Sequence, residues 1–210
     1  MGRVEDILTH LENLYPEATI ELHYTNGVEL LVAVMLSAQS TDASVNQLTP
    51  ALFQEYKTLD DFADAETSEL EQAIKRIGLY KNKAKNIKRT AQTLRNRFGG
   101  RIPDTLADLT SLPGVGRKTA NVVLSVWHGV ARIAVDTHVE RVAKRLKLAY
   151  KKDSPLKVEE KLMRKIPEDE WSKAHHQFIF FGRYHCTARN PKCDGCPLKP
   201  WCRFPNINVK

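Results

Sequence analysis

No stretch of this chain stays apolar for long. The longest apolar run, residues 30–36, would make about two turns of buried helix, whereas a membrane span requires roughly 18 residues. The amino terminus lacks the basic and then apolar order of a signal peptide, and low-complexity tracts and obvious repeats are absent. These absences exclude a membrane-spanning protein and give no indication of export. We therefore expect a soluble, cytoplasmic protein without a membrane partner.

Strand patterns are nearly missing as well. Only residues 130–135 alternate like a strand, and this segment is too short to support a sheet. Elsewhere apolar residues recur at helical spacing, which predicts helices at about 4–14, 30–36, 45–56, 68–77, 84–98, 105–111, 117–127, 137–147, 156–165 and 169–182. Pro50 is expected to break or kink its helix, and Ser68 with Glu71 resembles a capping box. The predicted fold class is all-α.

Acidic residues are outnumbered by basic ones. The formal net charge is +7 over 210 residues and the pI is about 9.2, which favours a polyanionic partner. Residues 81–97 contain no acid and seven cations: Lys81, Lys83, Lys85, Lys88, Arg89, Arg95 and Arg97. A helix without anions has little internal pairing, so we interpret this segment as a phosphate-binding face. The alternative is an ordinary solvated face.

Cysteine is absent from the first 185 residues. The four cysteines are Cys186, Cys193, Cys196 and Cys202, separated by six, two and five residues. Four thiols on one short loop can enclose a single soft metal centre. Zinc sites usually combine two short knuckles, and only Cys193–Cys196 has that form, so an iron–sulfur cluster is favoured over zinc. Disulfides are the least favoured alternative because the cytosol is reducing. The same loop carries four cations that are candidates for contact with a DNA backbone: Arg189, Lys192, Lys199 and Arg203.

Residues 109–123 have the pattern of a helix, a tight turn and a second helix. Gly114 and Gly116 permit positive φ angles and leave the backbone N–H groups around Val115 uncovered by side chains. The second helix is expected to begin near Arg117, so its positive dipole end faces the same turn. This arrangement predicts a phosphate cradle that needs no particular base sequence, although any helical hairpin could use such a turn.

Lys118 follows this turn directly and has two interpretations. It is either one more cation over a phosphate or a nucleophile that attacks an electrophilic sugar carbon. A nucleophilic lysine must be neutral, and the positive end of a helix disfavours the ammonium form. The sequence places the lysine suitably for this chemistry without deciding between the two.

Asp136 stands where a short apolar run meets a predicted helix. It is a candidate N-cap, and a capping carboxylate is held ionised by the N–H groups that it accepts from. A fixed negative charge would also stabilise a developing oxocarbenium sugar, and the two roles are compatible. His138 is more often a structural or phosphate-contacting histidine than a base.

The hairpin at 112–120, the Val-Asp-Thr-His-Val segment at 135–139 and the six-two-five cysteine spacing together resemble the endonuclease III family of helix-hairpin-helix DNA glycosylases. The similarity runs over nearly the whole chain and includes residues 36–42 and 77–80. It implies a six-helix barrel domain at 21–130 and an iron–sulfur cluster domain formed by 1–20 and 131–210. It also implies a bifunctional glycosylase and AP lyase that removes oxidised pyrimidines in base excision repair.

The same resemblance implies roles for individual residues. Lys118 falls on the nucleophile, Asp136 on the catalytic carboxylate, and the four cysteines on the ligands of a [4Fe–4S] cluster. Gln39 and Leu79 match the residues that fill the gap left by the extruded nucleotide and wedge the opposite strand. Two departures from the family pattern are Ser40, where alanine is expected, and the basic segment 81–83. Neither affects the chemistry.

Partners and rivals follow from the same comparison. The expected partner is double-stranded DNA with an oxidised pyrimidine or an abasic site, bound by a monomer of bacterial, nucleoid-associated type. Adenine glycosylases and mismatch-specific thymine glycosylases are disfavoured because both depart at the position of Lys118. A non-catalytic DNA-binding or redox-sensing module is the rival from another class, and it would form no covalent adduct with DNA.

Overall fold

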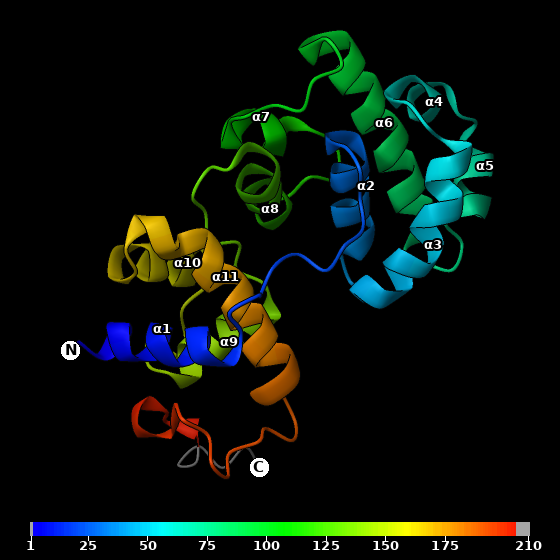
Figure 1. Ribbon diagram of the computed structural model, residues 1–210. Helices are drawn as coiled ribbons and strands as arrows, with labels where there is room; N and C mark the ends of the chain where they lie inside the picture. The colour runs from blue at the N-terminus through cyan, green and yellow to red at the C-terminus, as the bar shows by residue number, and fades with distance from the viewer. Residues whose placement is uncertain (1, 205–210) are drawn as a thin grey trace. The chain divides into compact units, whose positions relative to one another are not determined.

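The computed structural model describes residues 2–204, and this part of the chain is helical without a β-strand (Figure 1). It divides into two compact units: Glu21–Gly129, and Met1–Ile20 together with Val130–Lys210. The sequence predicts one domain at 21–130 and a second domain formed by 1–20 together with 131–210. Met1 and residues 205–210 of the second domain lie outside the described residues. No helix among residues 2–204 is both long and apolar enough to cross a bilayer.

The unit Glu21–Gly129 is a helical domain with α2 at its centre. Its helices are α2 (Gly27–Ser37), α3 (Asp42–Glu55), α4 (Leu59–Asp64), α5 (Thr67–Ala73), α6 (Tyr80–Phe98), α7 (Leu106–Ser111) and α8 (Arg117–His128). Every residue of α2 from Leu30 to Leu36 is buried, which explains why this helix is apolar on all sides. Helices α3, α6 and α8 pack against α2.

The longest helix of this unit, α6, orders the segments around it. Its N-cap is Leu79 and its C-cap is Gly99, both in the left-handed conformation, as the Gly99-Gly100 pair predicts for the carboxyl end. Its buried face includes Ala84, Ile87 and Leu94. The short helix α4 lies along its carboxyl-terminal half, where Arg95 pairs with Asp64 at 2.9 Å and with Asp60 at 3.4 Å.

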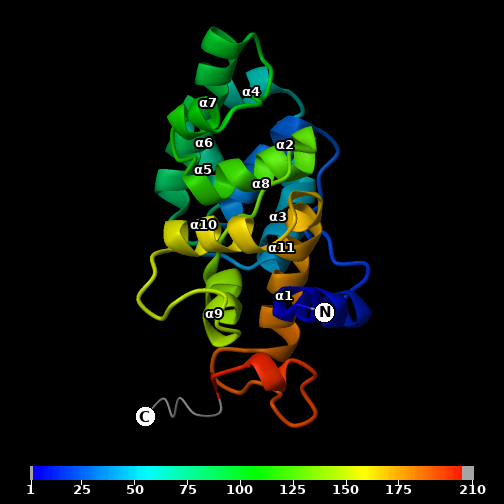
Figure 2. The same cartoon turned by 90° about the vertical axis from the view of Figure 1, so that its left-hand side faces the viewer.

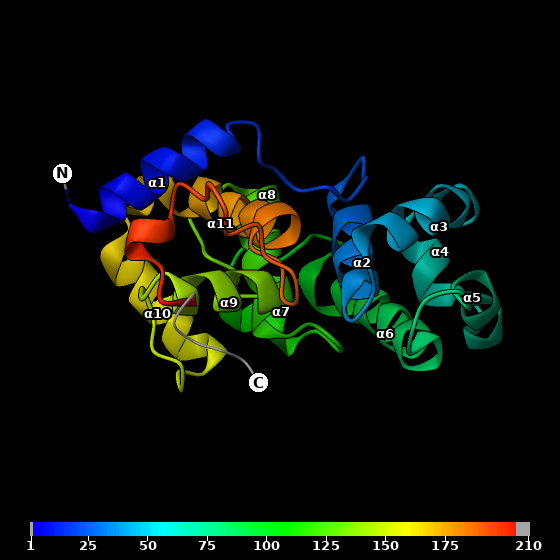
Figure 3. The ribbon, with the colours of Figure 1, turned by 90° about the horizontal axis from the view of Figure 1, so that it is seen from below.

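The second unit joins the two ends of the chain. Its helices are α1 (Arg3–Leu14), α9 (Thr137–Arg145), α10 (Pro155–Lys165) and α11 (Trp171–Phe180), followed by a π-helical turn, Phe181–His185. Figure 3 shows α1 beside α11. Ile7 and Leu11 of α1 are fully buried in one core with Val139 of α9 and Phe178 of α11. The amino-terminal helix therefore belongs to the domain that carries the cysteines.

Several local expectations were wrong. Pro50 does not break its helix, since α3 continues through it to Glu55. Helix α5 begins at Thr67 with Glu66 as its N-cap, so Ser68 lies inside the helix and forms no capping box. The fifth helix ends at Ala73, short of the predicted end at 77. The sequence does not predict helix α4, because six residues are too few to show a helical period. This helix, and not α5, begins with a capping box, which is formed by Thr58 and Asp61.

Candidate DNA-binding and catalytic site

The hairpin between α7 and α8 has the geometry of an anion-binding turn. Val115 N donates to the carbonyl of Leu112 at 3.1 Å, and Gly114 has a φ of +78°. Gly116 is the N-cap of α8 and has no side chain to accept from the first N–H groups of that helix. The side chain of Val115 is buried, so only its backbone is available to a phosphate. The hairpin thus presents main-chain donors and the positive end of α8.

Two polar side chains of α6 hold this hairpin in place. Thr90 Oγ1 donates to the carbonyl of Pro113 at 2.7 Å. The Asn86 side chain packs so closely on the turn that a Cβ at Gly114 would lie 2.8 Å from Asn86 Cβ. Because both residues lie on the face of α6 that is turned to the hairpin, the helix fixes the turn before any DNA arrives.

Substituting the two hairpin glycines with alanine is expected to separate folding from binding. Gly114→Ala should lower stability by about 1–3 kcal/mol and weaken DNA binding, because it combines positive φ with the clash on Asn86. Gly116→Ala should lower stability by no more than about 1 kcal/mol, the difference between glycine and alanine as an N-cap, since nothing lies within 4 Å of its Cβ, and should act mainly on DNA binding. Thermal unfolding and DNA affinity at fixed salt measure both effects. Equal destabilisation by the two variants would contradict this account of the turn.

Lys118 and Arg117 occupy the first turn of α8. Both side chains are exposed, directly after the hairpin, while the next residues, Thr119 and Ala120, are buried and anchor the helix. The helix therefore presents an amine and a guanidinium at the same end as the free N–H groups.

Gln39 and Leu79 share an unusual backbone. Both have positive φ angles, 56° and 60°, which few non-glycine residues adopt. Both side chains are exposed, and Leu79 is 56% exposed although it is apolar. They lie on neighbouring segments of the same unit, because a Cβ at Gly78 would be 3.8 Å from the carbonyl oxygen of Gln39. An exposed leucine in a strained turn suits insertion between bases.

Asp136 caps α9, as the sequence predicts. Its Oδ1 accepts hydrogen bonds from the N–H groups of His138 and Val139, both at 2.8 Å. The side chain of His138 takes no part in these bonds. Its Nδ1 lies 3.2 Å from Arg141 Nη2, and its Cβ packs against Gly182. The carboxylate is thereby fixed on the positive end of a helix, with its other oxygen not used by the cap.

The four cysteines border one cavity. It is lined by Cys186, Cys193, Cys196 and Cys202 together with apolar walls that include Leu146, Phe181 and Leu198. Each cysteine is a free thiol, and no three His, Cys, Asp or Glu side chains in residues 2–204 converge on a single-ion site. A cavity lined by four thiols suits a group larger than one metal ion, so the donor set fits an iron–sulfur cluster.

Two arginines of α9 bind the start of the cysteine loop. Arg145 Nη1 donates to Cys186 Sγ at 3.1 Å and to the carbonyl of Thr187 at 2.8 Å, while Arg141 Nε donates to the carbonyl of Cys186 at 3.1 Å. Figure 2 shows α9 directly above this loop. Burial raises the pKa of the Cys186 thiol, and the hydrogen bond from Arg145 opposes this shift. The helix that Asp136 caps is therefore joined to the cysteine loop.

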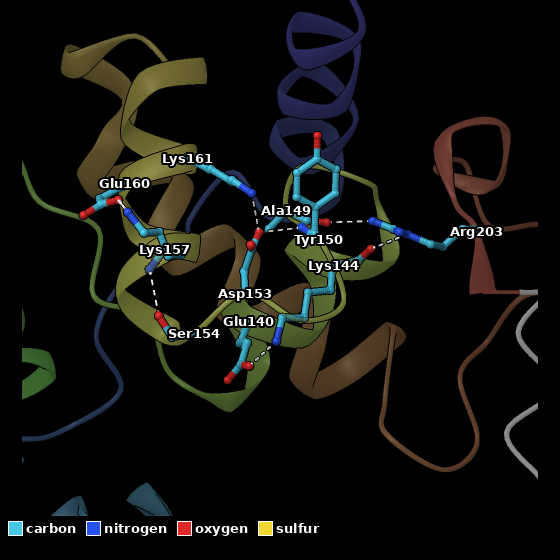
Figure 4. A network of polar contacts seen from close by, with 10 residues as sticks. All are labelled: Glu140, Lys144, Ala149, Tyr150, Asp153, Ser154, Lys157, Glu160, Lys161 and Arg203. Atoms are coloured by element: carbon cyan, nitrogen blue, oxygen red, sulfur yellow. Dashed lines mark hydrogen bonds and ion pairs between the residues drawn. The ribbon is translucent and has the colours of Figure 1, made fainter.

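The cations of the loop divide into two groups. Arg189, Lys192 and Lys199 are exposed and stay available to an anionic partner. Arg203 is not available to such a partner, because its guanidinium turns inward and donates to the carbonyls of Lys144 and Ala149, at 2.8 and 2.6 Å (Figure 4). Of the four candidate cations, Arg203 is therefore the one whose guanidinium is engaged within its own domain.

The phosphate-binding face predicted for residues 81–97 is also smaller than expected. Arg95 is engaged by the two aspartates of α4, and Lys83 is 7% exposed, so neither belongs to a free cationic surface. Lys81, Lys85 and Arg97 remain exposed along the helix.

The chain combines a helical domain that has the geometry of an anion-binding hairpin with a second domain that has four clustered thiols. This combination indicates a helix-hairpin-helix protein with a metal centre. Residues 32–168 match the HhH-GPD superfamily of base excision DNA repair proteins, and residues 186–202 match the iron–sulfur binding domain of endonuclease III. The chain is 53% identical to endonuclease III of Bacillus subtilis over 97% of this chain and 93% of that protein. It is 43% identical to endonuclease III of Escherichia coli K12, over 95% and 94% of the two chains.

Solved structures agree with these relatives. A trapped covalent intermediate of endonuclease III with DNA superimposes with a TM-score of 0.95, at 48% identity over all of both chains. A non-covalent endonuclease III–DNA complex gives 0.94, at 50% identity over 97% of this chain and 96% of that one. The chain belongs to the endonuclease III family. It is a DNA glycosylase with AP lyase activity and binds a [4Fe–4S] cluster, which confirms the predicted fold class, family, activity and cofactor.

The residues that position the hairpin and the cysteine loop were not predicted from the sequence. Asn86, Thr90, Arg141 and Arg145 were not singled out, although each contacts a segment that was. Their spacing carries a signal: Thr90 lies three residues after the buried Ile87, and Arg145 three after the buried Val142. A polar residue on an apolar helix face indicates a buried partner.

Proposed function

We propose that this chain excises oxidised pyrimidines of the thymine glycol type from double-stranded DNA and then nicks the strand, with Lys118 as nucleophile and Asp136 as catalytic carboxylate. The observation that carries the proposal is the exposed Lys118 amine at the start of α8, directly after the hairpin. The enzyme is proposed to act as a monomer associated with the nucleoid. Gly114, Val115, Gly116, Arg117, His138, Arg189 and Lys192 are proposed to contact DNA.

The proposed reaction begins with extrusion of the damaged nucleotide, because a base inside the stack cannot be reached. Unstacking costs a few kcal/mol, less for a damaged base, which favours lesions over normal pyrimidines. Gln39 fills the vacated gap and Leu79 wedges the opposite strand. An exposed leucine is suited to this role because insertion between bases removes its apolar surface from water.

Chemistry follows at the sugar. The Lys118 amine attacks C1′ through its nitrogen lone pair as the glycosidic bond breaks, and the base leaves with the electron pair of that bond and takes up a proton. The Asp136 carboxylate stabilises the positive charge that develops on the sugar. The ring then opens to a protonated Schiff base with Lys118, which acidifies the C2′ proton. Loss of that proton expels the 3′ phosphate by β-elimination, and water releases Lys118.

Borohydride trapping tests the proposed mechanism. The protein is incubated with a duplex that contains one thymine glycol and, in parallel, with a duplex that contains one abasic site. A covalent protein–DNA band on both duplexes supports a Schiff-base enzyme for oxidised pyrimidines. A band on the abasic duplex alone overturns the proposed lesion class, and the absence of both bands overturns the covalent mechanism.

The four cysteines are proposed as the cluster ligands, one for each iron. Bound by these residues, the cluster would supply a cross-link for the carboxyl-terminal loop. Leu146, Phe181 and Leu198 wall the same cavity and are almost fully buried, so the metal site is continuous with the core of its domain.

Loss of one ligand is therefore expected to loosen this domain. Cys193→Ser should lower the iron content and reduce the thermal midpoint by roughly 5–15 °C, since about 2–4 kcal/mol of lost core stabilisation shifts a chain of this size by about 2–4 °C per kcal/mol. Asp194→Ser is the matched control, an exposed neighbour in the same loop. Iron and sulfide analysis with thermal unfolding measures the effect. Full iron content in Cys193→Ser would remove that residue from the ligand set.

A further inference from the structure

The buried amine of Lys83 lies beneath the turn that carries Gln39. The side chain belongs to α6 and is 7% exposed. Its Nζ donates to the carbonyls of Leu36 and Ala38, at 2.8 and 2.7 Å, and lies 3.2 Å from Ser40 Oγ. These three acceptors account for the three N–H groups of an ammonium. Burial lowers the pKa of Lys83.

The acceptors occupy the carboxyl end of α2 and the turn that follows it. Leu36 and Ala38 lie in the last turn and at the C-cap of this helix, where carbonyl groups lack intrahelical partners and a cation is favoured. Between Ala38 and Ser40, Gln39 adopts its φ of 56°. A left-handed glutamine persists only where the surroundings hold it, and Lys83 bonds to the residues on both sides.

The same lysine lies one helical turn beyond Leu79. Its backbone N–H donates to the carbonyl of Leu79 at 3.1 Å, which closes the first turn of α6 on the second residue with positive φ. The two turns also approach each other, because a Cβ at Gly78 would lie 3.8 Å from the Gln39 carbonyl. One residue is thus bonded to the segments that present both Gln39 and Leu79.

We propose that Lys83 is a positioning residue that holds Gln39 and Leu79 in the geometry needed to replace the extruded nucleotide in the duplex. This inference rests on the proposed insertion roles of those two residues. It also explains the basic segment 81–83: Lys81 is exposed, whereas Lys83 serves the interior. Ser40, where the family pattern predicts alanine, supplies the third acceptor.

The test compares Lys83→Met with Lys57→Met, which removes the same charge from an exposed position of the same unit outside the phosphate-binding face. If only about a tenth of the protein molecules hold both turns in the geometry needed for insertion, the apparent affinity for lesion duplex falls about tenfold. We expect that loss in Lys83→Met, with base release from the duplex reduced and nicking of a single-stranded abasic oligonucleotide unchanged within about twofold. Lys57→Met should show neither change, because its charge lies outside the predicted phosphate-binding face.

A fluorescent adenine analogue opposite the lesion reports insertion directly, because its emission rises when stacking is disturbed. We expect the rise in wild type and its loss in Lys83→Met. Equal losses on duplex and single strand would reduce Lys83 to a general stabilising residue, and an unchanged duplex signal would overturn the positioning role. Ser40→Ala is the milder variant if Lys83→Met does not fold, and it should lower the duplex signal in part.

Gln39→Ala and Leu79→Ala distinguish the inference from the function on which it rests. If both leave the fluorescence rise intact, the proposed insertion roles fail. If they abolish it while Lys83→Met does not, only the inference about Lys83 fails.

Discussion

Lys118→Gln is expected to abolish base release and strand nicking together, with a decrease of roughly three or more orders of magnitude, because both steps pass through the same amine. Glutamine keeps much of the length and the polarity of the side chain but carries no nucleophilic lone pair on an amine. Lys118 is exposed on the first turn of α8, so its replacement removes no core contact. Single-turnover assays on a thymine glycol duplex and an abasic duplex measure the two activities, and thermal unfolding checks the fold.

Arg117→Gln provides the matched control for this variant. It removes one positive charge from the same helical turn and leaves the amine in place. We expect weaker binding at high salt, with the slope of log affinity against log salt reduced by about one, and a borohydride-trapped adduct as in wild type. A trapped adduct in Lys118→Gln would show that another amine is the nucleophile. Equal losses in both variants would mean that Lys118 acts through its charge alone.

The sequence predicts those features that depend on local order. Apolar periodicity places most of the helices, because a helix that packs on one side repeats its buried residues. Asp136 is recognisable as an N-cap from its place before a helical run, and the structure confirms the two bonds. The cysteine spacing indicates a metal centre because the chain between the thiols is too short to separate them.

Features that depend on contacts between residues far apart in the chain cannot be predicted from the sequence. Lys83 and Lys85 differ by only two positions on a basic helix, yet one is buried under the end of α2 and the other is exposed. Arg203 turns from the surface to the carbonyls of Lys144 and Ala149, which lie 59 and 54 residues earlier in the chain. In both cases most of the partners are backbone carbonyls near the end of a helix or in a turn, which no side-chain pattern marks.

The charge of Asp136 and its role as a cap are separable by substitution. An asparagine at this position would still accept from the N–H groups of His138 and Val139, because asparagine is as good an N-cap as aspartate. Asp136→Asn should therefore retain stability within about 1 kcal/mol. Base release should fall by about 10²–10³-fold, the effect of removing one preorganised electrostatic stabiliser of a transition state.

Asp136→Ala should show the same loss of base release and in addition lose about 1 kcal/mol of stability with the cap. Ser154→Ala is the control for that second effect, since Ser154 caps α10 in the same domain through the N–H of Lys157 and should affect stability alone. Nicking of a preformed abasic site should fall less than base release in Asp136→Asn, because no glycosidic bond to a base has to break. If Asp136→Asn released the base at the wild-type rate, the carboxylate would be a cap and nothing more, and the charge that stabilises the sugar would have to come from elsewhere on the enzyme.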